Sequence, residues 1–384
     1  MSPQAAPAGR PRIVTIVPGL RYGGAEIGLL RLVRASAADF DHQVIALKRD
    51  GPLAADFLAA GAEVVELDLS SLWLHPWRLA TLVQTLRVAR PAVLVAHMTR
   101  GALLAALVRP LVGRRIALVW VFHQSLDMRR RLARSARWSL AACRVLAGAA
   151  QRIVHVSERS RADHIAYGFP AGRSIVLGNG IDTEAFAADQ AVRGRVRSEW
   201  GFGPDDIVIG HVARVDWTKD HATSLAAFEI AADADARLRL VLCGQGTEAL
   251  AVPSRLAARV IRLGTRRDVA AVMNGCEIGL LSSITESLPN VLLEWMACQR
   301  PVVTTDVGDS AAVCAPYGRA VPSGRPDELA AALLEIAALG PAERAELGRR
   351  ARAAVIDRFA ISRLARSHER MWRELIDARS TEAR

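Results

Sequence analysis

Short runs of apolar residues recur along the whole chain and alternate with longer segments of helical spacing. The runs are rich in Val, Ile and Leu and are too short to form helices of ordinary length. They occupy residues 12–17, 42–47, 63–67, 92–96, 116–122 and 152–156, and then 206–212, 238–244, 259–264, 277–282 and 301–305. Continuous apolar runs predict strands buried on both faces, as in a parallel sheet with helices on each side.

A polar stretch interrupts this pattern once and separates the runs into two groups. A chain of 384 residues is long enough for two or three domains. We therefore predict an α/β protein with two doubly wound, Rossmann-like domains: residues 1–182, a linker at 183–205, and a second domain that begins at residue 206. Ligands of such sheets bind beyond the carboxyl ends of the strands, so we expect the site in an interdomain cleft.

The composition excludes several other classes of protein. Hydrophobic residues make up 51% of the chain and charged residues 23%, which is typical of a globular protein. The five cysteines form no CxxC pair, which argues against a zinc site and against a disulfide framework. Residues 1–10 lack the apolar core of a secretory signal, and no run reaches the roughly 18 apolar residues that a membrane span needs. We expect a cytoplasmic protein.

A glycine pair follows the first predicted strand. Gly23 and Gly24 open a helical segment, and glycines there let backbone N–H groups approach a ligand closely. The amino end of a helix favours phosphate, although an ordinary tight turn explains the pair equally well. The stretch is not GxGxxG, so a dinucleotide site is disfavoured.

Two cations follow the first strand of the second half. Arg214 and Lys219 lie five residues apart after the run that ends at residue 212. Arginine can hold a diphosphate through two hydrogen bonds, and lysine supplies a compact charge. An anion site is therefore favoured over a chance pair of surface charges.

Two glutamates, Glu286 and Glu294, lie on either side of a predicted helix start. Pro289 suits the first turn of that helix, where its missing N–H costs nothing, and the free N–H groups of that turn would face the cleft. Side chains on a helix lean toward its amino end, so Glu294 should point at the volume that Glu286 borders. Carboxylates accept hydrogen bonds from sugar hydroxyls, and the arrangement indicates a receptor for a nucleotide sugar.

Two histidines end neighbouring strands in the first half. His123 ends one predicted strand and His97 another. A single histidine is more often structural than catalytic, and we keep that interpretation for His97. His123 lies where the cleft is expected, so we favour a role in ligand binding for it.

The net charge of +11 is concentrated in one segment. Residues 109–152 hold ten arginines and one acid. The part from Arg129 to Arg144 has helical spacing, with arginines on one face and apolar residues on another. A basic amphipathic helix suits an anionic membrane surface, but a solvated helix face explains it as well. A nucleic-acid-binding protein is disfavoured because aromatic residues make up only 5% of the chain and no stacking motif accompanies the arginines.

These motifs together resemble the retaining glycosyltransferases of family 4, which have the GT-B fold. The matching features are "GGAE" after the first strand, "VFH" at His123, "VSE", "NGID", the cations at 214 and 219, "LG" followed by Asp268, and the glutamate pair. The resemblance covers nearly the whole chain, and the ordered set is far more specific than any one motif.

The resemblance implies a role for each candidate residue. Gly24 and its loop would lie near the diphosphate and acceptor, and His123 would contact the transferred sugar. Arg214 and Lys219 would neutralise the leaving diphosphate, so that no metal or other cofactor is expected. Glu286 and the backbone of Leu288, Pro289 and Asn290 would contact the sugar or phosphate, and Glu294 would hold the ribose. The second domain would end near residue 358, and a helix at 359–384 would return to the first domain.

Three positions depart from the family pattern, and several functions stay open. Ser287, Asp220 and Gln299 stand where glycine is usual, which affects the assignment of the donor sugar. The resemblance implies transfer from a nucleoside-diphosphate sugar to a glycan or polyprenyl-linked acceptor, in the assembly of exopolysaccharide, capsule or lipopolysaccharide. A sugar-nucleotide epimerase or a phosphorylase on a similar scaffold is the alternative.

Overall fold

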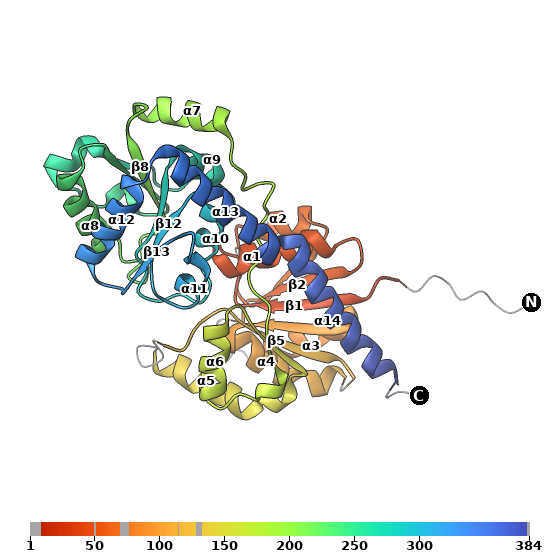
Figure 1. The fold of residues 1–384 in the computed structure, drawn as a ribbon. Helices are drawn as coiled ribbons and strands as arrows, with labels where there is room; N and C mark the ends of the chain where they lie inside the picture. The colour runs from red at the N-terminus through yellow and green to blue at the C-terminus, as the bar shows by residue number, and fades with distance from the viewer. Residues whose placement is uncertain (1–8, 50, 70–76, 114, 128–132, 382–384) are drawn as a thin grey trace, which may run out of the picture. The chain divides into compact units, whose positions relative to one another are not determined.

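The structure is a computed structural model that describes residues 9–49, 51–69, 77–113, 115–127 and 133–381. The chain divides into two compact units (Figure 1). Unit 1 comprises Met1–Gly180 together with Ile361–Arg384, and unit 2 comprises Ile181–Ala360. Each unit contains one sheet whose described strands all pair in parallel.

Unit 1 is built on a seven-stranded parallel sheet with the order β3-β2-β1-β4-β5-β6-β7. The strands are β1 (Arg12–Val17), β2 (Asp41–Ala46), β3 (Glu63–Glu66), β4 (Val93–His97), β5 (Ala117–Phe122), β6 (Arg152–His155) and β7 (Ser174–Val176). β4 and β5 are buried at every residue, as the continuous apolar runs predict for central strands. The chain passes from β1 to β2 on one side, while β4 lies on the other side of β1.

Helices cover both faces of this sheet. They are α1 (Gly24–Ser36), α2 (Ala54–Ala59), α3 (Trp77–Ala89), α4 (Met98–Val112), α5 (Arg134–Leu146), α6 (Glu158–Ala166) and α14 (Ile361–Thr381). Side chains of α3, α4 and α5 share one core cluster with the sheet. Side chains of α1, α2 and α14 lie in two others, and α14 packs against α1 and against β4 and β5 of the sheet. Trp372 of α14 is buried there with Ile13 of β1 and Leu32 of α1.

Unit 2 is built on a six-stranded parallel sheet with the order β10-β9-β8-β11-β12-β13. The strands are β8 (Ile207–Val212), β9 (Leu238–Cys243), β10 (Val260–Arg262), β11 (Ile278–Leu281), β12 (Val302–Thr305) and β13 (Gly318–Val321). The helices are α7 (Gln190–Trp200), α8 (His221–Ala234), α9 (Val269–Gly275), α10 (Asn290–Ala297), α11 (Ser310–Cys314), α12 (Pro326–Ala338) and α13 (Pro341–Phe359). Its two ends meet, because Ile181 and Ala360 form a parallel β-bridge.

Two glycines in neighbouring strands determine where α10 packs on the sheet. Trp295 of α10 is fully buried and lies directly on β8 and β11. A Cβ atom at Gly279 would lie 2.4 Å from Cγ of Trp295, and one at Gly210 would lie 2.4 Å from Cη2 of the same ring. The missing side chains therefore make room for the indole, and the indole positions the helix that carries Glu294.

The predicted fold class is confirmed, because both sheets are parallel and alternate with helices. The structure differs from the sequence prediction in detail. The segment 183–205, expected as a linker, contains α7, whose Trp200 packs in a core cluster of unit 2. The short strands β7 and β13 lie outside the predicted runs. The chain enters unit 2 at Ile181, and the terminal helix belongs to unit 1 from Ile361 onward.

Candidate active site

Unit 2 brings its candidate residues together where the order of its strands reverses. β8 and β11 are neighbours in the sheet, but the chain leaves β8 toward β9 on the other side. The loops that follow β8 and β11 therefore diverge, and ligands bind at such a point in open α/β sheets. The first loop carries Arg214 and Lys219, and the second carries Glu286.

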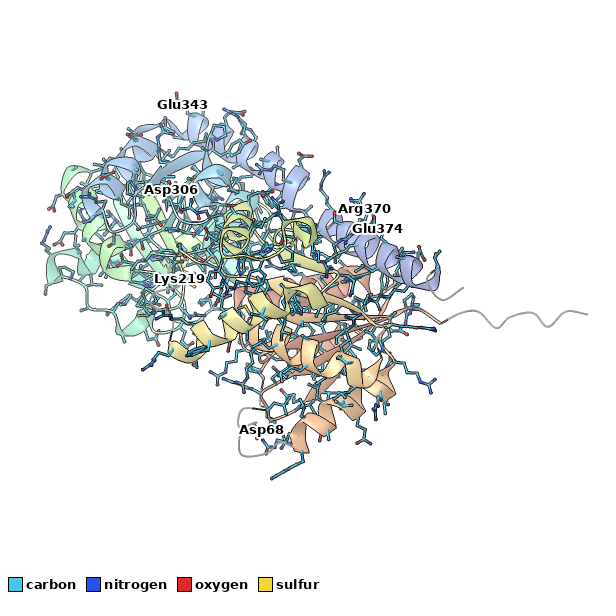
Figure 2. All side chains as sticks on the ribbon, turned by 90° about the horizontal axis from the view of Figure 1, so that it is seen from below. Asp68, Lys219, Asp306, Glu343, Arg370 and Glu374 are labelled. Atoms are coloured by element: carbon cyan, nitrogen blue, oxygen red, sulfur yellow. The ribbon has the colours of Figure 1, made fainter. Side chains whose placement is uncertain are left out.

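Lys219 and Glu286 form a direct ion pair across these two loops. Nζ of Lys219 donates to Oε1 of Glu286, and the side chains are 22% and 14% exposed. The hydroxyl of Ser283 donates to the same Oε1 at 2.9 Å. Lys219 is labelled in Figure 2. Sequence reasoning assigns each of these residues a separate role and misses their pairing, because a separation of 67 residues carries no local signal of contact.

Hydrogen bonds hold the two loops in this arrangement. The hydroxyl of Ser282 donates to the carbonyl oxygens of Lys219 and Asp220 at 2.9 and 2.8 Å. The amide of Ile284 donates to the carbonyl of Thr218 at 2.8 Å. These hydrogen bonds to backbone carbonyls do not involve the charged side chains. The two loops are therefore held together without the help of the ion pair.

Two of the three departures from the family pattern have a conformational explanation. Asp220 has φ +47° and Gln299 has φ +59°, in the left-handed region that glycine adopts freely. Aspartate tolerates this region better than most residues. Asp220 also caps α8 by accepting from the amide of Thr223. The third, Ser287, is buried, and its carbonyl accepts from the amide of Asp309 at 2.9 Å.

Arg214 occupies a more open position than Lys219. Its side chain is 55% exposed, and its Nε lies 3.8 Å from Oδ2 of Asp216. The pKa of Asp216 is lowered, chiefly by the hydrogen bond from Thr218, with a smaller contribution from Arg214. The loop is pressed against the loop after β9, because a Cβ atom at Gly244 would lie 2.1 Å from the carbonyl oxygen of Ala213. Arg214 therefore presents an exposed guanidinium from a backbone that close contacts hold in place.

The helix α10 begins one residue later than the sequence predicts. Pro289 has extended backbone angles at the N-cap, and Asn290 is the first helical residue. Leu288, just before it, is buried. Glu294 lies half-buried in the second turn, close enough to Cys298 to contribute to the raised pKa of that thiol, although burial is the main cause.

The glycine pair of unit 1 opens α1, as predicted. Gly23 is the N-cap with φ −159° and ψ 160°, which is ordinary extended backbone, and Gly24 begins the helix. A Cβ atom at Gly23 would meet the carboxylate of Glu26 at 2.5 Å. This acid in the first turn offsets part of the positive potential that the amino end of a helix provides.

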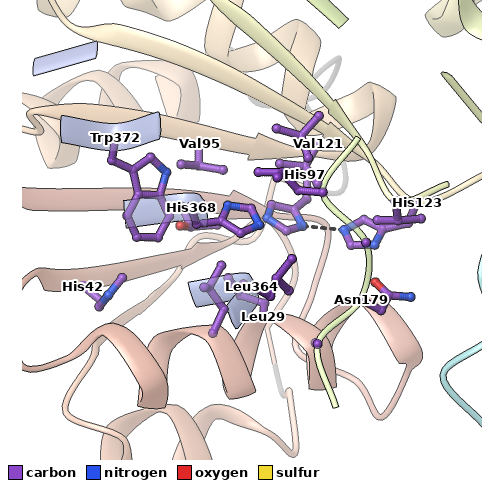
Figure 3. Close-up of a pocket in the computed structure, with 18 residues that line it drawn as sticks. Leu29, His42, Val95, His97, Val121, His123, Asn179, Leu364, His368 and Trp372 are labelled. Carbon is purple, nitrogen blue, oxygen red and sulfur yellow. Dashed lines mark hydrogen bonds between the residues drawn. The ribbon is translucent and has the colours of Figure 1, made fainter. Parts of the chain in front are cut away.

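His123 lies in a pocket of unit 1 and is hydrogen-bonded to His97 (Figure 3). Nδ1 of His97 and Nε2 of His123 are 2.9 Å apart. The pocket is also lined by Leu29 of α1 and by His368 and Trp372 of α14. The structural interpretation of His97 stays a prediction, and its hydrogen bond to His123 is a contact that the sequence does not predict. The contribution of α14 was missed as well, since it depends on where the C-terminal helix docks.

Burial keeps the imidazoles of this pocket neutral near pH 7. It lowers the pKa of His123, His368 and His42 to about 4. It also lowers the pKa of His97 well below its usual value, and the neighbouring His123 and His368 add to the effect. The charged form is disfavoured because a buried cation loses its hydration. These rings therefore act as neutral donors and acceptors.

The basic segment is only partly described. Arg129, Arg130 and Arg131 lie outside the described residues, and α5 begins at Arg134. Leu140 and Cys143 of α5 face the core. Trp138 is 75% exposed and Val145 is 77% exposed, and the exposed side chains Arg134 and Arg137 accompany Trp138. Arg109, by contrast, donates to the carbonyls of Ile116 and Ala149 and has a structural role.

Two negative observations apply to the described part of the chain. It contains no group of three or more histidine, cysteine, aspartate or glutamate side chains that could hold a metal ion. None of its helices is long and apolar enough to cross a membrane.

Family comparisons match both halves of the sequence. Residues 22–185 match the model of "Glycosyltransferase Family 4", and residues 206–338 match the model of "Glycosyl transferases group 1". Both halves of the chain match glycosyltransferase families. The boundaries agree with the two units, and the matches together with the fold support a glycosyltransferase of the GT-B type.

Individual relatives share shorter stretches. EpsF of Bacillus subtilis (strain 168), named as a glycosyltransferase, is 32% identical over 139 residues, which are 35% of this chain and 36% of EpsF. An N-acetylgalactosaminyltransferase of Campylobacter jejuni, named for a diphospho-undecaprenol substrate, is 35% identical over 106 residues, which are 26% of this chain and 28% of that protein. The matches thus span about a third of the length of these relatives.

Solved structures agree over nearly the whole chain. HepE of Anabaena, crystallised with UDP and glucose, has a TM-score of 0.81 at 20% identity, with 95% of this chain and 100% of that chain covered. WaaG, a glycosyltransferase of lipopolysaccharide biosynthesis, has a TM-score of 0.68 at 17% identity, with 93% and 98% covered. At such identities the likeness establishes the fold, which is the two-domain α/β layout of GT-B.

Proposed function

We propose that this protein is a retaining glycosyltransferase that moves a sugar from a nucleoside-diphosphate sugar to an acceptor hydroxyl. The observation that carries the proposal is the Lys219–Glu286 pair at the strand reversal of unit 2. A cation and a hydroxyl-binding carboxylate stand side by side there, beside the start of α10. That set suits a ligand in which a diphosphate is joined to a sugar.

The donor would be held by charge at its centre and by hydrogen bonds at its ends. Lys219 and Arg214 would stabilise the negative charge that develops on the diphosphate as the glycosidic bond breaks. Because these side chains supply the charge, we propose that transfer needs no metal. Glu286 would bind hydroxyls of the sugar, and Glu294 would bind the ribose. HepE has been crystallised in complex with UDP and with UDP-glucose, which makes UDP-sugars the first donors to test.

The acceptor would be a lipid-linked or growing glycan bound by unit 1. His123 would contact the transferred sugar, and the loop at Gly23 and Gly24 would border the same ligand. The similar Campylobacter transferase is named for a diphospho-undecaprenol-linked sugar, which supports a lipid-linked acceptor. We further propose a peripheral position at the inner face of the membrane, through the exposed Arg134, Arg137 and Trp138 of α5.

Product analysis tests the reaction class. The protein is incubated with UDP-glucose, UDP-galactose or UDP-N-acetylglucosamine and a polyprenyl-diphosphate-linked sugar, with and without EDTA. Transfer yields a longer glycan and free UDP, and NMR of the new linkage reports whether the configuration is retained. An epimerised nucleotide would favour the epimerase alternative, and a sugar phosphate would favour a phosphorylase. Loss of transfer in EDTA would contradict the metal-independent mechanism.

Donor binding is tested separately by thermal shift. A ligand at 100 times its Kd raises stability by about 2.7 kcal/mol, so UDP should raise Tm measurably. Glu294→Ala should abolish this shift if Glu294 holds the ribose. A wild-type protein that responds to none of UDP, GDP or ADP would argue against a preformed nucleotide site in unit 2.

A further inference from the structure

The hydrogen bond between His97 and His123 joins a candidate functional residue to a residue with no assigned role. The two rings come from the ends of neighbouring strands, β4 and β5. Nδ1 of His97 lies 2.9 Å from Nε2 of His123. The ring centroids are 5.0 Å apart, with 24° between the ring planes. Figure 3 shows His97 between His123 and His368.

One proton lies between the two rings and links their tautomers. If His97 donates it, the neutral His123 carries its own hydrogen on Nδ1 and offers a donor there. If His123 donates it, Nδ1 of His123 offers a lone pair, and His97 carries its hydrogen on Nε2. The bond to His97 uses Nε2 of His123, so Nδ1 is the ring nitrogen left to meet a ligand. The state of His97 thus decides what His123 presents to a ligand.

The backbone holds His97 in place for this contact. β4 ends at His97, and α4 begins at the next residue. Met98 makes this abrupt change of direction with φ +61°, in the left-handed region that a long side chain rarely adopts. Such an outlier persists only where the surroundings determine it, and it is common at functional sites. His97 is itself buried, so its ring has little freedom to turn away.

We propose that His97 is a positioning residue that holds the ring of His123 in one orientation and one neutral tautomer, with Nδ1 directed at the sugar. Where this concerns the reaction, it rests on the function proposed above. Burial, which lowers the pKa of both histidines, supports the neutral form. His97 does not touch the ligand and acts through His123, as a triad carboxylate acts through its histidine.

Imidazole NMR tests the positioning without any substrate. In wild-type protein labelled with ¹⁵N-histidine, His123 should show a single neutral tautomer from pH 6.5 to 8, and a coupling across the N–H···N bond to His97. His123→Gln identifies the signals. In His97→Phe, which keeps a ring of similar size, the His123 signals should move to values averaged between tautomers. His42→Phe, a change elsewhere in the same pocket, should leave them in place.

Two outcomes of this experiment overturn the proposal. One is an averaged tautomer of His123 in the wild type, and the other is an unchanged His123 spectrum in His97→Phe. Should His97→Phe not fold, the coupling in the wild type and the spectrum of His97→Asn decide the question. The amide of asparagine can place a hydrogen-bonding group near the position of Nδ1, so His97→Asn should keep His123 in one tautomer.

Kinetics then tests whether positioning matters to the reaction. His97→Phe should lower kcat for transfer at least tenfold while KM for the donor changes less than threefold, because only the orientation of His123 is lost. His97→Asn should recover kcat to within about threefold of the wild type. Equal kcat in all three proteins would refute the catalytic half of the proposal. A wild type without transferase activity would refute the proposed function instead, and the NMR result would stand by itself.

Discussion

Substituting Lys219 by methionine separates two contributions of the Lys219–Glu286 pair. Methionine removes the charge but keeps most of the length of the side chain. The proposed mechanism places this charge against the leaving diphosphate. Losing one such group costs about 2–4 kcal/mol in the transition state, which is a decrease of roughly 30- to 1000-fold in kcat/KM.

The same substitution also affects stability, for a different reason. Glu286 is only 14% exposed, and in Lys219→Met its carboxylate keeps the hydrogen bond from Ser283 but loses its counter-charge. A buried acceptor that loses one of its partners costs about 1–3 kcal/mol. Glu286→Gln in the same chain removes the charge that Lys219 balanced, so the double variant should be more stable than Lys219→Met alone.

The assay is therefore a double-mutant cycle with two readouts. Thermal unfolding compares wild type, Lys219→Met, Glu286→Gln and the double variant, and transfer from UDP-glucose, or from whichever donor proves active, gives kcat/KM for each. We expect Tm to recover in the double variant while kcat/KM stays low, because no charge has returned to the diphosphate. Lys219→Met with kcat/KM within twofold of wild type would refute the assignment, and additive effects on Tm would show that the two residues are not coupled.

Three further predictions concern stability and surface binding. The pKa values of His42, His123 and His368 lie near 4 in the folded protein and near 6.5 in the unfolded protein. Between these values the unfolded state binds more protons, so the free energy of unfolding decreases as the pH is lowered from 6.5 toward 4. The loss should be on the order of 1–2 kcal/mol per residue by pH 5, and urea unfolding at pH 7.5 and 5 that gives equal midpoints would contradict it. Gly279→Ala should destabilise unit 2 by about 1–3 kcal/mol through the clash with Trp295, whereas Gly194→Ala, where a Cβ atom meets nothing within 4 Å, should raise stability by roughly 0.5–1 kcal/mol; thermal unfolding distinguishes them. Arg134→Gln with Arg137→Gln should reduce sedimentation with phosphatidylglycerol vesicles relative to phosphatidylcholine vesicles, and unchanged binding would remove the membrane proposal.

The strands of both sheets could be predicted from the local sequence, because a strand buried on both faces is apolar at consecutive positions. Runs such as residues 116–122 are apolar at consecutive positions, and β5 is buried at every residue. Helix starts left weaker traces. Pro289 marks the beginning of α10 in the sequence, but in the structure it is the N-cap and not the first helical residue. The fixed φ of proline suits both positions, so the sequence does not distinguish them.

The unusual residues were also visible in the sequence, but their reason was not. Asp220 and Gln299 stood out as replacements for glycine. Only the backbone shows that both residues have positive φ. These two positions therefore need a left-handed backbone conformation, and they leave room for a side chain. The ion pair of Lys219 with Glu286 and the short β7 and β13 depend on pairing between distant segments, for which the local pattern carries no signal.

What the sequence by itself determined is the set of strands, the two-part α/β architecture and the residue types at strand ends, since each follows from local burial and local turns. What only the tertiary structure decided is which of those residues meet. His97 meets His123 because β4 and β5 are neighbours in the sheet. His368 joins them because α14, some 240 residues further along the chain, packs its apolar face on unit 1. Such contacts depend on how whole helices and strands pack together. The free energy of that packing is distributed over many buried side chains, so no single position in the sequence indicates it.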